Sequence, residues 1–202
     1  VEEQEQAKYF GVKDDFSISL WVKPESDAML NTDNPMGYIS YPWTEYYAIY
    51  PSHGELLHGT GHATCGMAIG RNGVAVWENA KGYPEFKMAV EKPISGWSHI
   101  CLVYKEGAPH IYINGEYVTY KTRSLQTIHP GLNPTTLKEG ASYYNGDMSV
   151  LVLFQRVLSN KEIYRLAAEG YVKKADERAL NWVPYAANRF LLAWHDGTYV
   201  FI

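Results

Sequence analysis

The chain has 202 residues and a formal net charge of −4 at pH 7. A chain of this length can bury roughly 70% of the surface that its unfolded form exposes, so we expect one self-sufficient core that needs no metal or disulfide. The weakly acidic balance offers no basic face to a polyanion, and no apolar run approaches the ~20 residues of a bilayer span. Neither nucleic acid nor a membrane is therefore an expected partner.

Both ends of the sequence indicate a piece of a longer protein. Residues 1 to 6 are too polar for the apolar part of a signal peptide, and the chain starts at Val1 rather than Met. The last residues, 198 to 202, have the composition of a strand. We therefore expect any targeting signal to lie outside this sequence.

The first strong strand signal is the segment 16 to 22, whose apolar residues fall on alternate positions, the period of a half-buried strand. Residues 24 to 62 are rich in Pro and Gly. We expect long loops there, interrupted by a short strand at 46 to 50.

An Asn-Gly pair occurs twice between strand-like segments, at 72 to 73 and at 114 to 115. Asn and Gly tolerate the positive φ that a type I′ hairpin turn requires, so each pair predicts two antiparallel strands. Two such hairpins favour antiparallel sheets over a parallel one. The flanking strands are expected at 67–69 and 74–77, and at 111–113 and 117–119.

Four residues in strand-like segments are expected to be core residues. Cys65 and Cys101 lie in apolar surroundings, and free cysteine behaves as a small core residue, so we expect two buried thiols rather than a disulfide. Trp21 and Trp97 are also assigned to the core.

The hydrophobic period changes near residue 150. Residues 150 to 154 are apolar without a break, which predicts a strand covered on both faces. Ser159 and Glu162 then form a capping-box sequence, the apolar residues that follow fall on one helix face, and Gly170 is placed to end the helix. We expect this to be the single helix of the chain.

The domain boundary is expected at residue 172. Residues 1–172 would form a β-sandwich, with the loops 24–62 and 121–146 as its working rim, because long ordered loops commonly carry function. Residues 173–202 would form a C-terminal extension whose hairpin, 190–202, could belong to a neighbouring domain.

The predicted fold class is all-β, an antiparallel two-sheet jelly-roll sandwich with one short C-terminal helix. The order of four motifs, 16–24, 96–99, 111–115 and 146–163, resembles the laminin-G-like, concanavalin A-like jelly-roll modules of secreted bacterial proteins, over about residues 14 to 170. Such modules are often appended to or inserted in large glycoside hydrolases. The segments 70–78 and 129–132 look like versions found in enzymes of the α-L-rhamnosidase type.

This resemblance implies a non-catalytic module that binds carbohydrate or braces a catalytic domain. The parent would be a secreted or periplasmic bacterial glycoside hydrolase that degrades polysaccharides. The expected partners are a polysaccharide or oligosaccharide and the catalytic domain of the parent chain. Two alternatives remain open: a jelly-roll lyase acting on a uronic acid polymer, suggested weakly by residues 122–129, and a pure structural spacer.

Aromatic residues supply the candidate carbohydrate site. The 17 Tyr and 6 Trp exceed what a core of this size needs, which leaves rings for the surface, where a ring can stack on a sugar. The alternative is packing, because Tyr47 and Trp77 lie in segments where alternate residues must be buried. The candidates are Trp43, Tyr46, Tyr47, Trp77, Tyr83 and Tyr143.

Carboxylates supply a candidate structural calcium site. Members of the resembled family often hold Ca²⁺, which prefers six to eight oxygen ligands, but the acidic pair usual in their late strand is Ser149-Val150 here. The remaining candidates are Asp147, Asp14 and Asp15. The alternative is that all three are solvated turn residues.

No catalytic residue is predicted in this chain. Retaining glycoside hydrolysis needs two carboxyls about 5 Å apart, and no predicted strand carries the alternating acidic pattern of sandwich glucanases. A zinc site is not expected either. His53, His58, His62 and Cys65 are close in sequence, but the glycines among them interrupt any helix that would align the rings.

Overall fold

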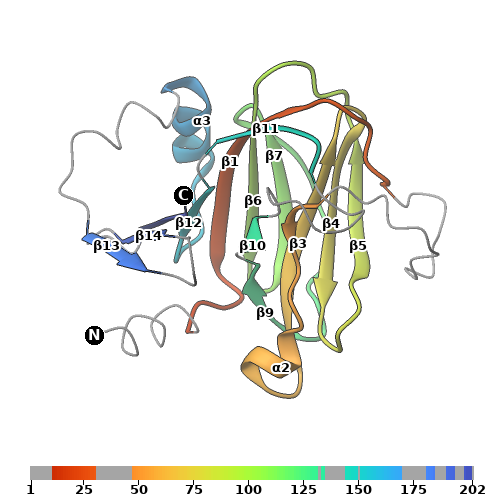
Figure 1. The fold of residues 1–202 in the computed structure, drawn as a ribbon, viewed down its shortest axis with the longest axis vertical. Helices are drawn as coiled ribbons and strands as arrows, with labels where there is room; N and C mark the ends of the chain where they lie inside the picture. Colours follow the sequence, from red (N-terminus) through yellow and green to blue (C-terminus); the bar gives the residue numbers. More distant parts are fainter. Residues whose placement is uncertain are drawn as a thin grey trace. The chain divides into compact units, whose positions relative to one another are not determined.

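The structure is a computed structural model, and it describes residues 11–30, 47–131, 133–134, 144–149, 151–169, 181–184, 190–193 and 198–201. Two β-sheets account for most of these residues, and all but one of their strand pairings are antiparallel (Figure 1). The predicted all-β class with two antiparallel sheets and a short C-terminal helix is therefore confirmed. Neither helix of the described residues has the length and apolar character needed to cross a membrane.

The chain divides into two compact units, each built around one sheet. The first unit comprises Val1–Trp21, Ser98–Thr122 and Ser149–Ile202, and the second comprises Val22–Trp97 and Arg123–Met148. Strand β1 (Phe16–Pro24) runs from the first unit into the second. The units are described separately below.

The sheet of the first unit has the strand order β13-β14-β15-β12-β1-β6-β7-β8. Strand β11 pairs with Val22–Pro24, the C-terminal residues of β1, and both of these segments belong to the second unit. The predicted strand at 150–154 is β12, and its described residues are buried on both faces. The other bounds are β6 (Ser98–Lys105), β7 (Ala108–Ile113), β8 (Glu116–Tyr120), β11 (Gly146–Met148), β12 (Leu151–Phe154), β13 (Asn181–Pro184), β14 (Phe190–Ala193) and β15 (Thr198–Phe201).

The C-terminal hairpin joins this same sheet. Strands β14 and β15 pair as the sequence predicted, and β15 also pairs with β12 through the register Leu151↔Phe201 to Phe154↔Thr198. Residues 173 to 180 lie outside the described residues, so the domain boundary at residue 172 stays a prediction.

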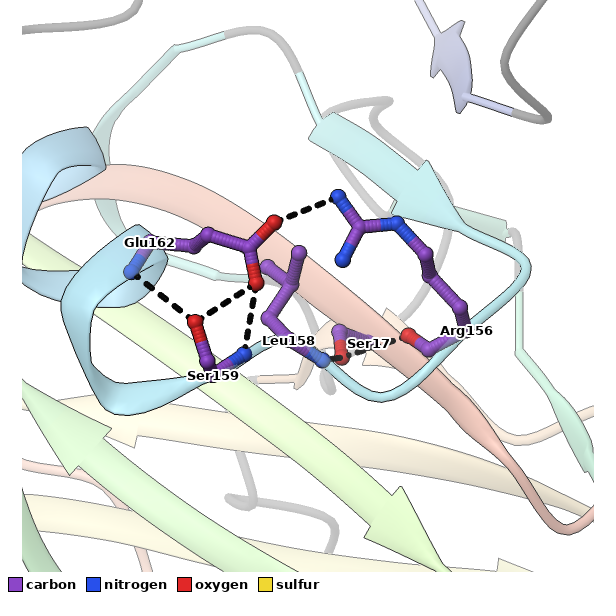
Figure 2. Close-up of polar contacts among 5 residues, drawn as sticks. All are labelled: Ser17, Arg156, Leu158, Ser159 and Glu162. Atoms are coloured by element: carbon purple, nitrogen blue, oxygen red, sulfur yellow. Dashed lines mark hydrogen bonds and ion pairs between the residues drawn. The ribbon is translucent and has the colours of Figure 1, made fainter.

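Strand β1 departs from the expected half-buried pattern, because its small polar residues are buried as well as its apolar ones. Ser17 is fully buried, and its Oγ donates to the carbonyl oxygen of Arg156 at 2.9 Å and accepts from the amide of Leu158 at 3.0 Å (Figure 2). A buried hydroxyl with both partners satisfied costs little. Ser17 thereby fixes the turn that leads into the C-terminal helix.

Helix α3 (Asn160–Glu169) begins with the predicted capping box (Figure 2). The Ser159 Oγ accepts from the Glu162 amide at 3.4 Å, and the Glu162 carboxylate accepts from the Ser159 amide at 2.8 Å. Arg156 completes the arrangement with an ion pair to Glu162 at 2.7 Å. That hydrogen bond to Arg156, together with the bonds from Ser159, lowers the pKa of Glu162 to about 2.

One face of the first sheet packs under α3. Cys101 and Val103 of β6, Val152 and Phe154 of β12, and Ile163 of α3 belong to one buried cluster, with Leu166 packed at its margin. The predicted apolar face of the helix is confirmed by Ile163 and Leu166, whereas Gly170 lies outside the described residues.

The sheet of the second unit has the strand order β10-β2-β3-β4-β5, and β9 pairs with β3 in parallel. The strand predicted at 46–50 is β2 in the described residues. The bounds are β2 (Tyr47–Tyr50), β3 (His62–Gly70), β4 (Gly73–Asn79), β5 (Glu85–Glu91), β9 (Thr127–Pro130) and β10 (Asn133–Pro134).

The structure confirms one predicted Asn-Gly turn and moves the other by one residue. Asn114 and Gly115 join β7 to β8 with φ of 53° and 82°, as a type I′ turn requires. In the β3–β4 hairpin, Gly70 pairs with Gly73, so the two loop residues are Arg71 and Asn72 rather than Asn72 and Gly73. The side chain of Asn72 instead bonds to the backbone amide and carbonyl of Ala28.

The sequence analysis missed the strands β5, β9 and β13, one hairpin turn and one short helix. Glu106-Gly107 joins β6 to β7 with φ of 52° and 74°, a two-residue turn that lacks the Asn-Gly signal. The one-turn helix α2 (Gly54–His58) lies within a segment predicted to be loop. Gly59 ends it with φ of 99°, and its amide bonds to the carbonyl of Glu55.

Candidate functional site

Three of the predicted sugar-binding residues, Trp43, Tyr46 and Tyr143, lie outside the described residues. Tyr47 and Trp77 are completely buried, so no face of either ring is open to a sugar. Their ring centroids lie 6.0 Å apart in an edge-to-face arrangement, and the Trp77 ring also meets Phe86. These two predictions are corrected: both side chains are core residues of the second unit.

Tyr83 is the remaining predicted ring, and 48% of its surface is exposed. It lies in the loop from β4 to β5, which is braced at its start. The amide of Gly82 donates to the Asn79 side chain at 2.8 Å, and Asn79 donates to the carbonyl of Pro51 at 2.9 Å. Tyr83 stays a prediction as a sugar contact.

The two tryptophans expected in the core differ in how far they are buried. Trp21 is half-buried beside the ring of His99, with centroids 5.5 Å apart. Trp97 is 51% exposed, so its assignment to the core was wrong. It follows Gly96, whose φ of 67° belongs to a turn before β6, and the strand therefore begins one residue later than Trp97.

Two of the predicted calcium ligands contact other groups of the protein. The carboxylate of Asp15 accepts from the amide of Glu106 at 2.8 Å, and that of Asp147 pairs with Lys23 at 3.3 Å. Among the described residues, no group of three or more His, Cys, Asp or Glu side chains could hold a metal ion. The structure therefore does not gather these carboxylates into the predicted site.

Three histidines form a cluster in the second unit. The rings of His58 and His129 stack with centroids 3.7 Å apart, and the Nδ1 of His62 lies 2.8 Å from the Nε2 of His129. Burial, with a smaller contribution from His62, lowers the pKa of His58. The cluster ties α2 and the start of β3 to β9, which is a structural role.

Glu78 is the one carboxylate that is buried among the described residues. It accepts a hydrogen bond from Ser124 at 2.5 Å, Lys87 donates to the same Ser124 hydroxyl at 2.7 Å, and the Lys87 and Glu78 charges are 3.9 Å apart. The carboxylate is therefore committed to a network that anchors residue 124 to the sheet.

Both cysteines are buried and free, as predicted. Burial raises the pKa of Cys65 to about 12 and also raises that of Cys101. Neither thiol is poised to act as a nucleophile, because the reactive species is the thiolate.

The sequence analysis missed a row of rings on the hairpin of β7 and β8, which we call the ring ladder: His110, Tyr112, Tyr117 and Tyr120. His110 pairs with Tyr120, and Tyr112 pairs with Tyr117, so the four side chains share one face of the sheet. The His110 and Tyr120 rings are nearly parallel, with centroids 5.4 Å apart. Tyr117 and Tyr120 are 48% and 59% exposed.

A β-bulge explains why the ladder was missed. The register shifts between Ile111 and Tyr112, which leaves Val118 as the extra residue of β8. By simple alternation, Tyr117 and Tyr120 are three residues apart and would lie on opposite faces. The tyrosine content of residues 112–120 was the available signal, but the bulge decides which face carries the rings.

The fold is that of a jelly-roll domain. It has two sheets whose neighbouring strands are joined by short hairpins, and a late strand that is followed by a helix. The chain belongs to the concanavalin A-like lectin/glucanases superfamily, whose family model matches residues 5–164. The resemblance read from the sequence motifs is therefore confirmed. No curated protein matches the sequence.

Solved structures of similar fold share little sequence with the chain. The binding domain of botulinum neurotoxin DC in complex with SialylT is 14% identical, with a TM-score of 0.51, and the match covers 80% of this chain and 37% of that one. Domain 4 of AbnA, a GH43 extracellular arabinanase from Geobacillus stearothermophilus in complex with arabinotriose, is 17% identical, with a TM-score of 0.48 and coverage of 77% and 67%.

A putative carbohydrate binding protein from Bacteroides ovatus is 15% identical, with a TM-score of 0.46, and the match covers 94% of this chain and 52% of that one. This chain thus spans about half of that protein and less of the neurotoxin domain. At such identities the similarity concerns the fold alone.

Proposed function

We propose that this chain is a non-catalytic carbohydrate-binding module. The observation that carries the proposal is a set of large aromatic side chains exposed to solvent on a fold of the lectin and glucanase superfamily. The CH-rich face of a sugar ring is apolar, and its transfer from water onto an aromatic face is favourable. The exposed rings are Tyr83, Trp97, Tyr117, Tyr120 and Tyr164, each between 48% and 62% exposed.

The buried carboxylate supports binding over cleavage. A retaining glycosidase needs a nucleophilic carboxylate about 5 Å from a carboxylic acid that donates a proton. Glu78 instead accepts a hydrogen bond from Ser124 and lies 3.9 Å from the Lys87 ammonium, so it is engaged within the protein.

The parent would be a secreted bacterial glycoside hydrolase that degrades polysaccharides, with this chain holding the enzyme against its substrate or bracing the catalytic domain. Support for this finer statement comes from the motif order, which resembles modules of that kind. A secreted parent is testable by fractionating the source cells and detecting the parent chain with an antibody raised against this domain.

Affinity electrophoresis tests the binding function. The protein is run through native gels that contain neutral or acidic polysaccharides, beside a non-binding protein of similar size and charge, and positive polymers are followed by calorimetry with their oligosaccharides. We expect selective retardation by at least one polymer. The same incubations are assayed for new reducing ends and for unsaturated uronates, and we expect neither.

Each contrary result identifies a different function. If no polysaccharide gel retards the protein, the structural spacer is the function that remains. Unsaturated uronates would establish the lyase, and new reducing ends would establish a hydrolase.

A further inference from the structure

We propose that the ring ladder of β7 and β8 is the surface on which the glycan lies, and that its ligand is a neutral linear glycan of at least two sugar units. This inference rests on the proposed function and adds to it the site and the ligand class. It replaces the loop rim expected from the sequence as the place of binding.

The first argument is the exposure of the rings together with their alignment. Tyr117 and Tyr120 are each about half exposed, and the partly exposed His110 lies between them, with ring centroids 6.2 Å and 5.4 Å from theirs. The His110 ring is nearly parallel to Tyr120 and tilted by 45° from Tyr117, so the three rings offer neighbouring contacts on one face of the hairpin. A chain of sugar units can use such contacts together, whereas a single sugar can use only one.

The second argument is rigidity. The ladder residues are register partners on two hydrogen-bonded strands, joined by the type I′ turn at Asn114 and Gly115. Binding sites built on strands hold their side chains more accurately than loops do, and less conformational entropy is lost when a ligand binds.

The third argument is that one member of the ladder is firmly packed. Tyr112 is only 7% exposed, belongs to the buried cluster under α3, and donates from its hydroxyl to Asn160 at 2.9 Å. Its ring meets Tyr117 edge to face, with centroids 5.3 Å apart. Tyr117 is therefore supported on one side by a buried ring, while 48% of its own surface is exposed.

The ladder rings favour a neutral ligand because none of them is charged. Burial, with a smaller contribution from the Lys105 charge, lowers the pKa of His110, so this ring is uncharged at neutral pH. Glu116 pairs with Ile113 and therefore lies on the opposite face of the sheet from the rings. The two phenol hydroxyls and the imidazole can exchange hydrogen bonds with sugar hydroxyls without any charged group.

The experiment compares ladder variants with variants outside the ladder. Tyr117→Ala, Tyr120→Ala and the double variant are measured by calorimetry against the oligosaccharide series of the polymer that retards the wild type. Tyr83→Ala tests the ring of the β4–β5 loop as a competing site. Leu57→Ala and Leu125→Ala, two exposed apolar side chains that are not aromatic, are the controls. Circular dichroism and thermal unfolding verify that each variant is folded.

We expect each single ladder variant to weaken binding about 5- to 10-fold, the double variant to abolish it, and the controls to stay within about twofold. Tyr120→Phe should keep most of the affinity, because it keeps the ring. The wild type should bind a disaccharide measurably more tightly than the monosaccharide.

Two results would overturn the inference. If the wild type binds and the folded double variant binds equally well, the glycan lies elsewhere, and loss in Tyr83→Ala would move it to the β4–β5 loop. If only uronate-containing polymers bind, the ligand class is wrong. Absence of any binding by the wild type would instead overturn the proposed function.

Discussion

His99 is a buried imidazole in the first unit, and its surroundings make it sensitive to acid. Its Nε2 lies 2.8 Å from the Ser19 hydroxyl, and its Nδ1 has no hydrogen-bond partner within the described residues. Burial lowers its pKa from 6.5 to about 4. A neutral ring can remain in such a place, whereas a protonated ring loses its hydration without gaining a counter-charge.

The pH dependence of stability follows from this shift. Because the unfolded chain takes up the proton first, stability is lost as pH falls through 6.5 and continues to fall until about pH 4, by about 3 kcal/mol from this residue. Urea unfolding between pH 7.5 and pH 4 should show the loss. His99→Gln, which keeps a polar side chain without that titration, should lose less over the same range. An equal loss in the variant would place the acid sensitivity elsewhere.

The cysteines allow a second prediction at the residue scale. Both thiols are buried and their pKa values are raised, so neither should react with a disulfide reagent at pH 8 in the native protein. Both should react at once in guanidinium, and Cys65→Ala and Cys101→Ala should each remove one equivalent. Rapid reaction of the native protein would show that at least one thiol is accessible.

Several single residues could be assigned from the sequence because their surroundings are local. The capping pair Ser159 and Glu162 and the turn pair Asn114 and Gly115 are recognised over four residues or fewer. The exposure of Trp97 and the burial of Ser17 were not anticipated, because burial depends on distant parts of the chain. The hydroxyl of Ser17 is satisfied only by residues 156 and 158, 139 or more positions away.

At the scale of elements, α3 depends on its first turn. Ser159→Ala removes the hydroxyl that accepts from the Glu162 amide, and we expect this to lower the free energy of unfolding by about 1 kcal/mol. Equilibrium unfolding in urea measures the difference. Ser159→Asp, which restores an oxygen acceptor, should recover most of the loss. A change below about 0.3 kcal/mol in Ser159→Ala would mean that the ion pair between Arg156 and Glu162 suffices to start the helix.

The positions of several strands along the chain were predictable, but the sheet face on which each side chain lies was less so. Alternation and Asn-Gly turns located β1, β3, β4, β7 and β8 to within a few residues, because strand period and turn chemistry are local properties. A single bulge in the β7–β8 hairpin places Tyr120 on the same face as Tyr117, which strict alternation would not predict. The candidate site was therefore sought in the loops, although the sequence already contained its tyrosines.

At the scale of the whole molecule, the motif order was enough to identify the superfamily, since it reflects which segments must pair. The ligand site was not fixed by that order. Members of one fold differ in which exposed side chains they place on the shared framework. Tyr47 and Trp77 illustrate this limit: both were plausible as ring platforms by composition, and both fill the interior of the second unit.

The pairing of β15 with β12 has a consequence for anyone who shortens this chain. Ending it at residue 172 would strip the peptide groups of Leu151–Phe154 of their neighbour on that side. A bare apolar ribbon of this kind attracts the same ribbon on another copy, so the truncated product would tend to self-associate.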